Sequence, residues 1–166
     1  MKKIIFGLIA LFIIFLLNEK EEFIVIPNSS IRIRVISNSN NIDDLLKKKD
    51  VKSDLEGYLY SLLNGVSNIN DARIMIKDNL SNVNQIIEQN GVFKYQINYG
   101  FNHFPRKVYK GILYPEGDYE SIEVRLGEGS GDNYWCVLFP PLCLINENDT
   151  TSDVTYQLYV KELLRN

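Results

Sequence analysis

The chain has 166 residues, of which 45% are hydrophobic and 23% charged, and its formal net charge is −3. These values are ordinary for one globular domain, and they exclude a disordered chain and a disulfide-rich miniprotein. The mild acidity also argues against nucleic acid as a partner, since nucleic-acid-binding domains carry clustered positive charge. The basic run at 47–49 lies beside acidic residues on a predicted helix, so it indicates a solvated face of mixed charge.

Residues 1–22 have the organisation of an export segment. Lys2 and Lys3 precede an apolar run from Ile4 to Leu17, and a polar, charged stretch follows it. Such a run matches the hydrophobic region of a secretory signal and is short for a membrane-spanning helix. No clear cleavage site follows Leu17, so we predict either a signal peptide or a retained N-terminal membrane anchor. In both cases the rest of the chain is translocated.

A single domain is expected over 23–145, and its first half predicts a strand followed by two helices. Apolar and charged residues alternate over 31–36, which is typical of a strand whose apolar side faces a core. Apolar residues then recur at helical spacing over 42–63, where Asn64-Gly65 is a suitable stop. The same spacing predicts a second helix over 71–89. The two stripes suggest a helix pair packed against a sheet.

In the second half of the domain the hydrophobic period changes from 3.6 to 2. This pattern predicts strands over 93–99, 107–113 and 122–126. The segment 101–106, which carries His103, is expected to be a connection, and 115–118 a turn. A polar tail with a short helix is expected over 146–166. The whole predicts an α+β fold: an N-terminal strand, a two-helix pair, a mainly antiparallel sheet and a C-terminal glycine-rich, disulfide-closed loop.

The segment 127–143 carries most of the chemical information. Its three alternate glycines permit tight turns and close approach of the backbone to a partner. Neither a phosphate-binding loop nor a dinucleotide fingerprint fits, because no Gly-Lys-Ser/Thr follows and no helix is expected there. Cys136 and Cys143 are the two cysteines of the chain, and outside the cytoplasm we expect them to form a disulfide. They lack zinc-site spacing, and no metal or other cofactor is expected.

The same segment holds an apolar, aromatic cluster that is either a core strand or a rigid protein-binding loop. Pro140 and Pro141 cannot extend a central strand, so the chain must emerge there. Rigid aromatic and proline side chains bury much area at low entropic cost, which suits a binding surface. We therefore predict contacts with a partner protein at Glu128, Asn133, Tyr134, Trp135, Phe139, Pro140, Pro141 and Leu142.

Two other functions are compatible with the residues. In an extracytoplasmic cysteine hydrolase acting on cell-wall material, Cys136 would be the nucleophile and His103 its base. Asp132, Asn133 or Glu128 would then orient the imidazole. This requires a reduced Cys136 close to the single histidine of the chain. Retention of residues 1–22 would instead fit a membrane-anchored adaptor of the division septum.

The sequence also resembles the stage II sporulation protein R family. The resemblance rests on GEGSGDNYWCVLFPPLC at 127–143, on IRVISNS at 33–39, and on the order of 115–119 and 122–126. Tyr134 stands where a second tryptophan is expected. The resemblance implies a signalling protein without catalytic activity, exported across the forespore membrane into the space between the septal membranes. There it would activate a membrane-embedded aspartic protease of the mother cell, which processes pro-sigma-E.

Overall fold

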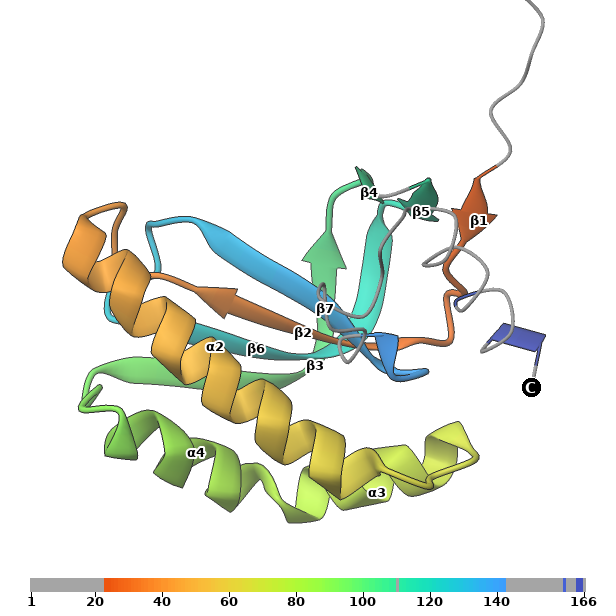
Figure 1. The fold of residues 1–166 in the computed structure, drawn as a ribbon, viewed down its shortest axis with the longest axis horizontal. Coiled ribbons are helices and arrows are strands. Elements are labelled where there is room, and N and C mark those ends of the chain that lie inside the picture. Colours follow the sequence, from red (N-terminus) through yellow and green to blue (C-terminus); the bar gives the residue numbers. More distant parts are fainter. Residues whose placement is uncertain (1–22, 110, 143–159, 161–163, 166) are drawn as a thin grey trace, which may run out of the picture.

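The structure, a computed structural model, describes residues 23–109, 111–142, 160 and 164–165. Over these residues helices lie on one face of a mixed sheet, and a smaller sheet lies at one end (Figure 1). The predicted α+β class is confirmed. The predicted export segment and most of the predicted tail lie outside the described residues. In the part of the chain that was placed, no helix combines the length and hydropathy needed to cross a bilayer.

The main sheet has four strands in the order β3-β6-β2-β7. Their bounds are Ile31–Ile36 for β2, Tyr95–Phe104 for β3, Gly117–Leu126 for β6 and Asn133–Phe139 for β7. β3 with β6 and β2 with β7 are antiparallel, in line with the predicted mainly antiparallel sheet, whereas the central pair of β2 and β6 is parallel. A parallel pair needs a long crossover, which the helices between β2 and β3 help to provide.

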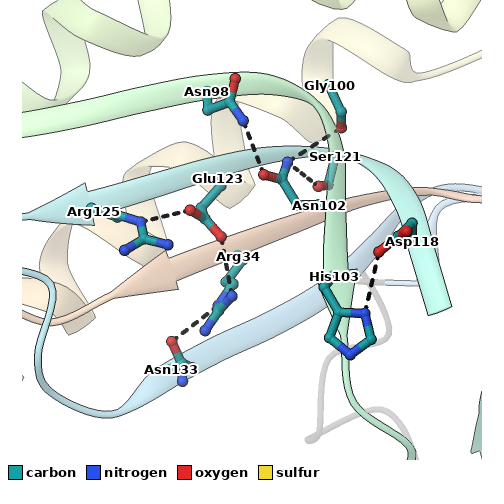
Figure 2. Close-up of polar contacts among 10 residues, drawn as sticks. All are labelled: Arg34, Asn98, Gly100, Asn102, His103, Asp118, Ser121, Glu123, Arg125 and Asn133. Atoms are coloured by element: carbon teal, nitrogen blue, oxygen red, sulfur yellow. Dashed lines mark hydrogen bonds and ion pairs between the residues drawn. The ribbon is translucent and has the colours of Figure 1, made fainter. Parts of the chain in front are cut away.

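His103 lies in β3, so the predicted connection over 101–106 was wrong. β3 continues beyond Tyr99 to Phe104 in unbroken register with β6, and His103 lies opposite Asp118. The strand bends near Gly100, as Figure 2 shows. Polar residues after the bend interrupt the alternation, so the sequence pattern did not indicate that the strand continues. β6 likewise begins at Gly117, inside the predicted turn.

The smaller sheet has the order β1-β5-β4 and packs beside the main one. Its strands are Ile24–Val25 for β1, Lys107–Tyr109 for β4 and Ile112–Tyr114 for β5. The single strand predicted over 107–113 is therefore two strands. Gly111 separates them with a φ of 74°, a left-handed conformation that glycine adopts readily. A small core forms here from Ile26, Ile112, Val137, Leu142 and Val160.

The helices are α2 (Ile42–Leu63), α3 (Ile69–Asp78) and α4 (Leu80–Gln89). α2 has the predicted bounds, but the single helix predicted over 71–89 is two helices that meet at Asn79. The Asn79 amide donates to Met75 O at 2.9 Å and accepts from the Tyr58 hydroxyl at 2.9 Å. Asparagine side chains that bond to nearby backbone compete with the helical ladder, which accounts for the break.

The large core lies between the helices and one face of the main sheet. The predicted core residues of β2 are buried there with partners from α2, α3, α4 and β6. The cluster includes Ile31, Ile33, Val35, Val51, Leu55, Leu59, Ile76, Val83, Ile87, Ile122, Val124 and Leu126. Each such side chain contributes about 1.5–3 kcal/mol when fully buried. The opposite face of the sheet, free of these helices, carries polar and charged side chains (Figure 2).

Candidate functional site

Two segments far apart in the sequence, 33–39 and 127–143, form one structural unit. β2 and β7 pair antiparallel, with Arg34 opposite Trp135 and Val35 opposite Tyr134. Beyond the paired strands, the loop 127–132 packs on the loop 37–41. We call these two loops the two-loop junction. Of the two predictions left open for the aromatic cluster, the strand is confirmed, because Asn133–Phe139 is strand β7 on the edge of the sheet.

The backbones of the two loops are joined by hydrogen bonds that centre on Asn38. Its Oδ1 accepts from the Glu128 N–H at 2.9 Å, and its carbonyl accepts from the Ser130 N–H at 3.1 Å. Its amide donates to Asp44 Oδ2 at 2.9 Å, which ties the junction to the first turn of α2. Gly131 N–H donates to the carbonyl of Ser37 at 3.0 Å. Asn38 thus bonds to two other segments, the loop 127–132 and the first turn of α2.

The glycines of the signature allow this close approach. Gly127 has a φ of 58°, and a Cβ placed there would lie 2.6 Å from Asn38 Cγ. A Cβ at Gly131 would lie 2.5 Å from the carbonyl carbon of Ser39. Both distances are shorter than real Cβ contacts. The glycines were predicted to allow close approach of a partner. In the structure the segment that approaches them is the loop 37–41 of the same chain.

Further contacts hold the junction to the helices and to β3. Lys48 Nζ donates to the carbonyl of Asp132 at 3.1 Å, and the Tyr134 hydroxyl donates to the carboxylate of Glu56. Glu128 forms an ion pair with Lys94, and the hydrogen bond from that lysine lowers the pKa of the Glu128 carboxyl. The junction is therefore a braced surface whose outer side chains remain exposed.

The predicted contact residues fall into three groups by exposure. Glu128 and Asn133 are exposed. Half-buried positions are Tyr134, Trp135, Phe139, Pro140 and Pro141. Leu142 is 3% exposed and packs in the small core, so it supports the turn after β7 from beneath. The first two groups can present atoms to a partner, whereas Leu142 contributes through packing.

The side chains of β7 divide between the two faces of the sheet. Tyr134, Cys136 and Phe139 pack against the large core. Trp135 lies on the polar face, where its ring meets Phe104 edge-on with centroids 6.0 Å apart. Cys143 lies outside the described residues, so its disulfide with Cys136 stays a prediction.

The polar face beside the junction is organised around Glu123, as Figure 2 shows. Arg34 Nη1 lies 3.1 Å from Glu123 Oε2, and Arg125 Nε lies 2.7 Å from Glu123 Oε1. Arg34 Nε also donates to Asn133 Oδ1 at 3.1 Å, which links this network to a predicted contact residue. Sequence reasoning placed Arg34 away from the core but missed the network. The alternation of apolar and polar residues in β2 and β6 indicates which side chains point away from the core. It does not reveal that the two strands are neighbours.

The hydrogen bonds of Cys136 and His103 do not join these two residues to one another. The two residues lie on β7 and β3, the opposite edges of the sheet, with β2 and β6 between them. Cys136 packs against the large core, whereas the end of β3 meets the neighbouring Trp135 on the other face through Phe104. The His103 imidazole is exposed and lies 3.2 Å from Asp118 Oδ1, a carboxylate that reaches it from β6 (Figure 2). Over the described part of the chain, no three His, Cys, Asp or Glu side chains gather as a possible metal site.

Comparison with known proteins identifies the family. Residues 27–149 match the family model described as Stage II sporulation protein R. This chain belongs to the stage II sporulation protein R family. Stage II sporulation protein R of Bacillus subtilis (strain 168) is 33% identical over 128 residues, which cover 74% of this chain and 57% of that protein. The chain thus spans little more than half the length of that relative. No solved structure matches the chain.

The family match includes both segments of the structural unit described above. The resemblance inferred from the sequence is therefore confirmed, and a role in sporulation follows from it. In structural terms, the two segments that carry the resemblance are those that meet at the β2–β7 pair and the two-loop junction.

Proposed function

We propose that this chain is an exported sporulation signal that activates a membrane-embedded aspartic protease, which then processes pro-sigma-E in the mother cell. Membership of the stage II sporulation protein R family supports the proposal. The chain acts as a ligand and has no catalytic activity of its own. Residues 1–22 direct it across the forespore membrane into the space between the septal membranes, as a signal peptide or as a retained anchor.

The main structural support for the proposal is that the two signature segments, 33–39 and 127–143, pack together and form one braced surface. The two-loop junction and β7 display Glu128, Ser130, Asp132 and Asn133, while Asn38 and the glycines fix the backbone beneath them. A ligand activates a partner only if it binds the active state more tightly than the inactive one. A surface that is already ordered loses less conformational entropy on binding, so more of its contact energy is available as affinity.

The cysteine hydrolase alternative receives no comparable support. Its nucleophile, Cys136, packs on the helix-covered face of the sheet. The exposed His103 already lies beside Asp118. An active site would require these groups within hydrogen-bond reach of one another or of one substrate.

The proposal is tested by reconstituted processing in a non-sporulating bacterium. The full chain is co-expressed with the cognate membrane protease and pro-sigma-E, and shortened sigma-E is detected by immunoblot. We expect product with the full chain and none with a matched chain that lacks residues 1–22, because that chain stays on the wrong side of the membrane. Absence of product, with all three proteins present and the full chain exported, would contradict the proposal.

A further inference from the structure

The sheet face opposite the helices carries a surplus of positive charge. We call it the cationic face and define it by Arg32, Arg34, Lys107 and Arg125 with Trp135 among them. Lys107 Nζ lies 5.5 Å from the centre of the Trp135 ring, and Arg34 Cζ lies 5.9 Å from it. Arg34 and Arg125 both bind Glu123, the one carboxylate that the described residues contribute to this network. Within the described part of the chain, Arg32 and Lys107 form no ion pair, although the net charge of the protein is −3.

Arg32 is the least compensated of these charges. Its side chain is 2% exposed, and its Cζ lies 3.3 Å from the centre of the Tyr119 ring. Among the residues that the structure places, no carboxylate forms an ion pair with it and Nη2 has no hydrogen-bond partner. Burial lowers the pKa of the guanidinium, although stacking on Tyr119 favours its charged form. A buried, unpaired cation projects its field strongly through its low-dielectric surroundings.

Trp135 adds an unused donor at the same place. Its indole Nε1 is buried and has no acceptor within the described part of the chain. An unsatisfied buried donor is costly, so such groups mark positions where an acceptor is supplied from elsewhere. Trp135 lies opposite Arg34 across the β2–β7 pair, so its indole and the Arg34 guanidinium share one part of the face.

We propose that the cationic face is a docking site for an acidic, extended segment of the partner protein, whose carboxylates bind Arg34 and Lys107 alongside Trp135. This inference rests on the proposed function for the identity of the partner. Glu123 and Asn133 hold the Arg34 guanidinium in position through Nη1 and Nε, and Nη2 remains as a donor for a carboxylate of the partner. Lys107 and Arg125 are exposed and could meet a lipid surface, but the Arg34 side chain is only 21% exposed and Trp135 is half-buried, so contact with these two favours a segment that enters the face.

The test compares two charge-matched double variants of the full chain in the processing assay. Arg34→Gln/Lys107→Gln removes two charges from the cationic face and leaves Glu123 paired with Arg125. Lys49→Gln/Lys77→Gln removes two charges from the helices. At limiting expression we expect at least about tenfold less product from the first variant and wild-type product from the second. Equal product from both variants, at equal protein levels and melting temperatures, would overturn the inference.

A binding measurement separates failure of this inference from failure of the proposed function. Synthetic peptides that tile the exported segments of the protease are titrated against the purified chain, alongside vesicles of anionic and of neutral lipid. We expect an acidic peptide to bind, to bind more weakly at high salt, and to lose about tenfold in affinity with Arg34→Gln/Lys107→Gln. Binding to anionic vesicles but to no peptide would overturn the docking proposal even if wild-type chain activates processing. Wild-type chain that binds a peptide without yielding product would count against the activator role alone.

Discussion

Asn38 lies where the Cβ of any residue other than glycine at position 127 would have to be. Its Oδ1 accepts the backbone N–H of Glu128 at 2.9 Å, and Gly127 leaves the space for it. The two residues come from segments about 90 positions apart, and each lies just after the last residue of a strand, β2 or β6, in the main sheet. The two signature segments therefore depend on one another for their conformation.

Replacing Gly127 by alanine is expected to destabilise the protein by at least about 2 kcal/mol. The cost combines the left-handed φ of 58° with the overlap between the new Cβ and the Asn38 side chain. The measurement is the free energy of unfolding from urea titration. Gly57→Ala is the matched control, because Gly57 lies within α2 with nothing near its Cβ position, and it should stabilise by about 0.5–1 kcal/mol. Similar losses in both variants would show that the junction does not require glycine.

The sequence predicted best those elements whose pattern is local. β2 and α2 were found with the observed bounds, because alternation and helical spacing are both strong over their whole lengths. The break at Asn79 was missed, since it depends on the Tyr58 hydroxyl of another helix. The end of β3 was missed because its polar residues, such as Asn102 and His103, pair with β6 across a bend.

For the candidate site, the sequence identified the segment but not its conformation. The glycines, Trp135 and the two prolines pointed to 127–143, and the structure does bring this segment against 33–39. Trp135 lies on a strand because its segment pairs with β2. The sequence of the segment by itself does not reveal this pairing. Predicting the charge network would require knowing the strand order β3-β6-β2-β7, because Arg34 and Glu123 are 89 positions apart in the sequence.

The Tyr58 hydroxyl should stabilise the break between α3 and α4. It donates to Asn79 Oδ1 at 2.9 Å and accepts from Asn82 Nδ2 at 2.6 Å. Tyr58→Phe is expected to lower the free energy of unfolding by about 1–2 kcal/mol. In an Asn79→Ala background the same change should cost clearly less, because one partner is already gone. A double-mutant cycle with no coupling between the two positions would contradict this account of the break.

The two cysteines are expected to be oxidised in the exported protein. Intact mass after denaturation and alkylation should show no added label, and label should appear at both thiols only after reduction. The bridge would close a loop of about eight residues, so reduction should cost at most about 2.5 kcal/mol of stability on the chain-entropy model. Labelling of unreduced protein would remove the disulfide from the account and reopen the question of a reactive Cys136.

The turn after β7 is expected to matter for activation more than for stability. Pro140 and Pro141 are half-buried and follow the last residue of β7. Replacing both by Gly-Ser makes this turn flexible, so product in the processing assay should be lost while the circular dichroism spectrum is retained. Ser67→Gly, in the exposed loop before α3, is a control that should keep full activity. Full processing with the Gly-Ser variant would exclude this turn from the activating surface.

The proposed activator role requires that this chain switch on the protease from the exported side of the membrane. The most direct measurement adds purified, exported-form chain to membrane vesicles whose outer surface corresponds to that side and which contain the protease and enclosed pro-sigma-E. We expect the amount of shortened sigma-E to rise with the concentration of added chain and then to saturate, and we expect no product from chain unfolded before addition. No product at any concentration, from vesicles in which both proteins are intact and correctly oriented, would contradict the account.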